Sequence, residues 1–289
     1  MPLETTRLLN IGLRFTTLGT RFLFIFVLAK YLDPASVGYY GIFTATVGYC
    51  LYFVGLDFYT YLTREILTKP LNQRGQLIKA QAALSGILYL FFLPIALTFL
   101  AYVDWPDSLV LWFFPLLLLE HFNQEVSRLL IALSEQLTAS MILFVRQGSW
   151  AIASAALMKF EPETRNLNLV MALWTAAGVC AGMIGLFKFK RLGMDGWKKR
   201  VDWRWIRKGV AVSSMFLIAT LALRGVQTLD RYWLEALNGI DMVAAYVLLL
   251  GVASTLLVFL DAGVFAFTYP SLITHHNDRN YEAANRKVR

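Results

Sequence analysis

The sequence predicts an all-α membrane protein, a polytopic helix bundle, and three observations support this prediction. Hydrophobic residues make up 57% of the 289 residues. The mean hydropathy is +0.55, which is higher than a soluble domain of this length carries. Charged residues make up only 16%, and they gather in short stretches between long apolar runs. Apolar runs of about 20 residues are typical of transmembrane helices.

Eight apolar segments are long enough to be expected as membrane spans. They cover about Leu9–Tyr31, Val37–Tyr59, Ala80–Tyr102, Leu109–Leu133, Leu137–Met158, Leu167–Phe187, Gly209–Leu229 and Val243–Phe265. The fourth segment is interrupted by the polar stretch EHFNQEVSR. The two cysteines each lie inside an apolar run and lack metal-ligand spacing, so we expect no metal site and no cofactor.

The lysines and arginines predict the orientation, because cytoplasmic loops of membrane proteins carry an excess of them. With the N-terminus inside, nineteen fall in inner segments, four lie at outer ends and four lie within spans. Both termini are therefore expected to be cytoplasmic. The net charge of +8 is explained by these loops, and no nucleic-acid-binding motif appears, so no nucleic-acid partner is expected.

The start of the chain is echoed near its end. The pattern KY, VGYY and LD over residues 30–57 recurs as RY, VAAY and LD over residues 231–261. Six predicted spans separate the two copies, as in a parallel repeat of six-helix halves. This predicts a six-helix lobe at 1–192, a basic cytoplasmic linker at 193–208, and the first two helices of a second, truncated lobe at 209–289. Chance similarity between apolar segments is the alternative.

The linker carries an apolar pattern of its own. Trp197, Val201 and Trp205 are spaced at i, i+4 and i+8, and the lysines lie elsewhere on a helical wheel. This spacing is typical of a helix lying on anionic lipid. A basic inner loop without a helix is the other interpretation.

Four arginines lie within the predicted spans, where an ionised side chain costs about 2.5–3.5 kcal/mol at the bilayer centre unless it has a partner or a hydrated cavity. They are Arg14, Arg21, Arg146 and Arg224. The polar stretch of the fourth span offers Glu120 and Glu125 as partners. One interpretation is that the arginines and glutamates form buried ion pairs between packed helices.

The other interpretation is that the arginines line a hydrated cavity that receives an anion. A guanidinium group suits phosphate because it donates two parallel hydrogen bonds and stays protonated. Taken as a set, the arginines outnumber the acidic residues at mid-span, which favours the cavity. Arg14 and Arg224 lie closer to span ends, so they could extend to the interface instead.

Two segments of the chain resemble a known family. They are NIGLRFTTLGTRFLFIFVLAKYLDPASVGYYGIF and TLDRYWLEALNGIDMVAAYVLLLGVAS. Both are similar to polysaccharide flippases, the O-antigen translocase group of the multidrug/oligosaccharidyl-lipid/polysaccharide exporter superfamily. The resemblance implies a two-lobe transporter of twelve to fourteen helices around a cationic cavity. This sequence departs from that plan by having about eight spans.

The resemblance also implies what is carried. The expected substrate is an undecaprenyl-pyrophosphate-linked oligosaccharide, flipped across the bacterial cytoplasmic membrane for surface polysaccharide synthesis. Besides this lipid-linked oligosaccharide, the expected partners are membrane lipids and other polysaccharide-assembly membrane proteins. The predicted substrate-binding residues are Arg21, Arg146, Arg14, Arg224, Glu120 and Glu125. The first two would hold the pyrophosphate, the next two would assist, and the carboxylates would position the arginines or contact sugar hydroxyls.

Two alternatives remain open at this point. An exporter of small cationic drugs would share the fold, but such a site needs buried carboxylates rather than arginines. A membrane enzyme, such as a glycan polymerase or a lipid-dependent glycosyltransferase, would be expected to carry acid and base residues in a sizeable outer loop. The predicted outer loops are short, so we expect a transporter by alternating access rather than an enzyme.

Overall fold

The computed structural model describes residues 3–103 and 105–260, and every regular element in these residues is helical. In chain order the elements are α1 (Leu3–Tyr31), α2 (Pro34–Gly55), α3 (Tyr59–Thr68), α4 (Leu71–Tyr102), α5 (Asp107–Ala132), α6 (Gln136–Phe144), the π-helical turn η1 (Val145–Ser149), α7 (Trp150–Phe160), the 3-10 turn η2 (Pro162–Thr164), α8 (Leu167–Arg191), α9 (Trp203–Asn238) and α10 (Ile240–Leu260). The prediction of an all-α protein is confirmed for this part of the chain.

A helix occupies each of the eight predicted span positions, and α6, η1 and α7 together form one of them. Five helical segments are long and apolar enough to cross a membrane, and α9, which bends by 50°, makes a sixth if its two parts form one span. Helix α5 has the length of a span, at 26 residues, but its polar stretch lowers its hydropathy. The polytopic membrane bundle is thus confirmed. The predicted end of the eighth span, the repeated Asp261 and the basic C-terminal tail lie outside the described residues.

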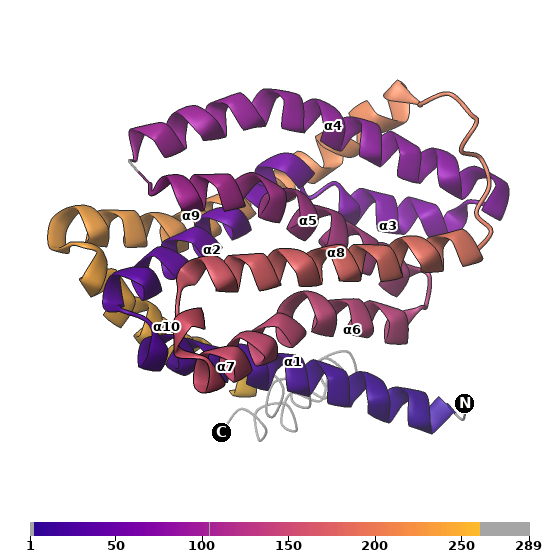
Figure 1. Cartoon of the computed structure of the whole chain (residues 1–289). Coiled ribbons are helices and arrows are strands. Elements are labelled where there is room, and N and C mark those ends of the chain that lie inside the picture. Colours follow the sequence, from indigo (N-terminus) through magenta and orange to yellow (C-terminus); the bar gives the residue numbers. More distant parts are fainter. Residues whose placement is uncertain (1–2, 104, 261–289) are drawn as a thin grey trace, which may run out of the picture.

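The connections between helices divide between the two ends of the bundle (Figure 1). The start of α1, the α5–α6 turn and the α8–α9 connection lie at one end, on the right of the view. The α4–α5 and α7–α8 connections lie at the opposite end. This arrangement agrees with helices that cross a membrane in alternating directions. The start of α1, the α5–α6 turn and the α8–α9 connection, which are all predicted to be cytoplasmic, therefore lie at one common end.

Helix α10 packs closely against α2, because two glycines of α2 face it. A Cβ atom at Gly41 would overlap the side chain of Val247, and one at Gly38 would overlap the backbone of Ile240. Val243 and Val247 are buried in the same apolar core as residues of α1 and α2. Helices α9 and α10 are therefore attached to the first six spans through α2. The division into two lobes stays a prediction.

Residues 192–202 of the basic linker form a docked loop, which agrees with the interpretation of a basic loop without a helix and not with a helix over Trp197 and Val201. Gly193 (φ 59) and Gly196 (φ 97) adopt left-handed backbone conformations that interrupt a right-handed helix. The loop pairs with the start of α4, where the Gly75 N–H donates to the Asp195 carbonyl at 2.8 Å. Asp202 caps α9 by accepting from the Trp205 N–H at 3.0 Å. The cap places the helix start ten residues after the linker begins.

Candidate functional site

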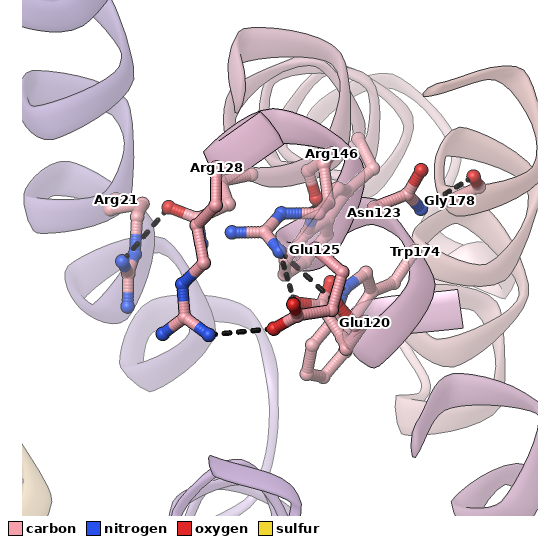
Figure 2. A network of polar contacts seen from close by, with 10 residues as sticks. Arg21, Glu120, Asn123, Glu125, Arg128, Arg146, Trp174 and Gly178 are labelled. Atoms are coloured by element: carbon pink, nitrogen blue, oxygen red, sulfur yellow. Dashed lines mark hydrogen bonds and ion pairs between the residues drawn. The ribbon is translucent and has the colours of Figure 1, made fainter. Parts of the chain in front are cut away.

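Two glutamates of α5 each hold an arginine, and these two pairs organise the polar interior of the bundle. Figure 2 shows Arg146 directed toward Glu120 and Arg128 directed toward Glu125. The polar stretch that interrupts the fourth predicted span therefore faces protein rather than lipid. Glu120, Asn123 and Glu125 of this stretch contact polar groups of neighbouring helices, which offsets the cost of placing charge at membrane depth.

The Arg146–Glu120 pair is almost completely buried. The Arg146 and Glu120 side chains are 8% and 9% exposed, and Arg146 NH1 lies 3.4 Å from Glu120 Oε2. Arg146 NH1 also donates to the Glu120 carbonyl at 3.2 Å. Trp174 Nε1 donates to Glu120 Oε1 at 2.8 Å. The pair therefore links α5, η1 and α8, and it matches the ion-pair interpretation for Arg146.

The Arg128–Glu125 pair is more accessible to solvent, and an aromatic ring packs against its arginine. Arg128 NH1 lies 2.7 Å from Glu125 Oε1, with side chains 24% and 13% exposed. The Arg128 guanidinium lies over the ring of Tyr59, 3.6 Å from its centroid, as in a cation–π contact. Gln81 of α4 donates a short hydrogen bond to the second carboxylate oxygen of Glu125. Arg128 is thus held from two sides but is not sealed from its surroundings.

A pocket of about 370 Å³ opens beside Arg128, between α2, α5 and α9. Its lining residues are Tyr52, Asp57, Tyr59, Arg128, Ala219, Thr220, Leu223 and Arg224. The lining therefore contains two guanidinium groups and one carboxylate. Asp57 reaches the pocket because α2 ends just before it, where Leu56 (φ 49) and Asp57 (φ 51) both adopt left-handed conformations. Aspartate tolerates this region better than most residues.

Arg14 and Arg21 of α1 lie at the interface between α1 and the continuous helix formed by α6 and η1, which we call the α1 seam. Arg14 Nε donates to Asn10 Oδ1 at 3.3 Å and to Ser140 Oγ at 3.1 Å. Arg21 NH1 donates to Gln147 Oε1 at 3.1 Å. Both arginine side chains are exposed. Neither forms an ion pair with any residue that the structure describes, so their charges meet only neutral groups there.

The six predicted site residues occupy three places rather than one. Arg14 and Arg21 line the α1 seam, Arg146 and Glu120 form the buried pair, and Arg224 lines the pocket. Glu125 adjoins the pocket through Arg128, which is not among the predicted substrate-binding residues. The spacing of Glu125 and Arg128 at i, i+3 was the signal for this pair. The binding roles of the six residues stay predictions.

The described residues contain no group of three or more His, Cys, Asp and Glu side chains that could hold a metal ion. No protein-family model, no curated protein and no solved structure matches the chain.

Proposed function

We propose that this protein is a flippase that moves a lipid-linked oligosaccharide, joined to its lipid through pyrophosphate, across the cytoplasmic membrane of a bacterium for surface polysaccharide synthesis. The observation that carries the proposal is the pocket between α2, α5 and α9, which is lined by Arg128 and Arg224. A guanidinium group in a partly dehydrated pocket binds phosphate oxygens through charge-assisted hydrogen bonds. The protein would act as a transporter and not as an enzyme.

The charges around the pocket favour an anion. Arg224 donates to Gln227 at 3.1 Å and forms no ion pair with the residues described, so its charge is available. Arg128 shares its charge with Glu125, and Asp57 supplies the one carboxylate of the lining. A volume of about 370 Å³ lies within the range of about 300–1,000 Å³ that small-molecule sites occupy. A pyrophosphate group with its first sugar has the size of a small-molecule ligand.

The position of the pocket suits alternating access. Helices α2 and α5 belong to the predicted first lobe, whereas α9 begins the predicted second lobe. A rocking movement of one lobe against the other would therefore change the shape of the pocket. The lipid tail would remain in the bilayer while the head group crosses. Arg21 and Arg14 supply further charge along the α1 seam, and the charge bias of the loops predicts that both termini are cytoplasmic.

Surface glycan measured in the native host, with the chromosomal copy replaced by variants, tests the proposal. Arg224→Ala and Arg21→Ala are expected to reduce surface glycan and to leave lipid-linked oligosaccharide at the inner leaflet. Arg224→Lys should retain part of the activity, because lysine keeps the charge but loses the planar fork. Arg191→Ala is the control, because Arg191 lies at the end of α8 and contacts Phe187.

The outcomes separate the alternatives. Normal surface glycan in both alanine variants, at normal protein levels, would contradict the flippase. Loss of drug resistance without loss of glycan would instead indicate a drug exporter. Glycosyl transfer by the purified protein would indicate a membrane enzyme.

A further inference from the structure

Arg128 belongs to two sites at once. Its guanidinium forms an ion pair with Glu125 at 2.7 Å, and it lines the pocket together with Arg224. The cation that neutralises a mostly buried carboxylate is therefore the same cation that an anion in the pocket would meet. An anion that draws the guanidinium toward itself weakens the pair with Glu125. This shared use of one cation connects the state of Glu125 to the occupancy of the pocket.

Among the residues that the structure describes, Arg128 is the one cation that forms an ion pair with Glu125. On α4, Gln81 donates a hydrogen bond to it, but an amide carries no charge. At the α2–α3 turn, Asp57 acts on it as a like charge. Arg224 of α9 lines the pocket with Arg128. A carboxylate at 13% exposure, with a like charge beside it and its cation withdrawn, is stabilised by binding a proton.

The surroundings of Glu125 offer two more titratable groups. His121 precedes it by one turn of α5, and the ring of His121 lies 5.6 Å from that of Tyr89 on α4. His121 Nε2 and Tyr89 Oη are buried and have no hydrogen-bond partner among the described residues. Neither of these groups is a carboxylate. Glu125 is therefore the acidic side chain of this cluster that a proton would neutralise when an anion engages Arg128.

We propose that binding of a phosphate-bearing anion to Arg128 is coupled to uptake of one proton by Glu125. The inference rests on the proposed anion pocket and adds a coupling ion to it. The proton comes from solvent and neutralises the carboxylate, and no covalent bond changes. Because linkage is reciprocal, acidification strengthens anion binding as much as anion binding strengthens proton binding.

Calorimetry of the purified full chain in detergent, titrated with inorganic pyrophosphate in buffers of different ionisation enthalpy, counts the protons taken up on binding. Glu125→Gln mimics the protonated state. Wild type is expected to take up more protons per pyrophosphate than Glu125→Gln, with a difference of up to about one. The protonation change of pyrophosphate itself is common to both proteins, so the difference isolates Glu125. Glu135→Gln is the matched control, because Glu135 pairs with Lys188 at 2.7 Å outside the pocket lining.

Affinity provides a second readout. Glu125→Gln is expected to bind pyrophosphate more tightly than wild type near neutral pH, whereas wild type gains up to about tenfold in affinity per pH unit of acidification. Asp57→Asn keeps a residue that tolerates the left-handed conformation and removes the like charge. Asp57→Asn should lower the pH midpoint of the change in pyrophosphate affinity. This variant replaces Glu125→Gln as the test if Glu125→Gln does not fold.

Two results would count against the inference in different ways. Equal proton uptake by wild type and Glu125→Gln, together with an unchanged pH midpoint in Asp57→Asn, would overturn the coupling and leave the anion pocket standing. Failure of pyrophosphate to bind wild type at any pH would remove the pocket itself, and the coupling with it.

Discussion

The pairs Arg146–Glu120 and Arg128–Glu125 have the same chemistry but different surroundings. Both glutamates lie on α5, one and a half turns apart. The first pair is sealed, with side chains less than one-tenth exposed, and Trp174 fixes its carboxylate. In the second pair the arginine side chain is 24% exposed, against 8% for Arg146, and it borders a pocket. An arginine at membrane depth therefore has a structural or a binding role according to what surrounds its partner.

Removing the acid from the sealed pair should have the largest effect. Glu120→Gln leaves Arg146 charged and buried without a counterion, which costs about 3–5 kcal/mol of unfolding free energy. Equilibrium unfolding in mixed micelles measures the loss. The double variant Glu120→Gln with Arg146→Met should recover most of it, because a neutral apolar side chain needs no counterion. Wild-type stability in Glu120→Gln would show that the pair is not structural.

The same change in the open pair should cost less. Glu125→Gln leaves Arg128 without its ion pair, but the Tyr59 ring remains beneath the guanidinium and the side chain keeps access to water. We expect a loss of about 1–2 kcal/mol in the same unfolding experiment. A loss equal to that of Glu120→Gln would contradict the distinction between the two pairs.

The aromatic support of Arg128 should contribute a smaller amount. Tyr59→Leu keeps an apolar side chain beneath the guanidinium and removes the ring, so it is expected to lower stability by about 0.5–1 kcal/mol. It should also weaken pyrophosphate binding, because Arg128 is then less well positioned. Tyr49→Leu provides the comparison, since Tyr49 contacts Phe53 and lies outside the pocket lining. Equal binding by the Tyr59 variant and wild type would contradict the positioning role.

The pair at the bundle end should contribute least. Glu135 and Lys188 are 2.7 Å apart, and their side chains are 31% and 28% exposed. Such pairs contribute about 0–1 kcal/mol, and salt screens them. Glu135→Gln should therefore unfold within about 0.5 kcal/mol of wild type. A larger loss of unfolding free energy would mean that the exposure of an ion pair in this protein does not predict its contribution to stability.

Much of the fold follows from the sequence, because apolar length predicts a membrane helix directly. The eight predicted positions all contain helices, yet their ends differ. Helix α4 begins at Leu71 instead of near Ala80. The polar residues that precede the apolar run at the membrane surface are also helical, and hydropathy does not report this extension. The second span ends at Gly55, and α3 follows as a separate helix. Two left-handed residues make this break, and hydropathy does not report backbone conformation.

The site was only partly predictable, because it depends on which helices meet. Sequence spacing placed Glu120 and Glu125 together with Arg146 as mid-span polar residues, but not which of them would pair. Arg128 was missed because its position near a span end satisfied the charge bias of inner loops. The pocket requires α9 to lie against α2 and α5, and the sequence does not report how distant helices pack.

The most direct test of the account is pyrophosphate binding by the purified chain. Wild type should bind, and both Arg224→Gln and Arg128→Gln should weaken binding about tenfold or more, because each removes a charged hydrogen-bond donor from the pocket. The Arg191→Gln control should bind as wild type does. Unchanged affinity in both pocket variants would contradict the central claim that these two arginines receive the anionic head group.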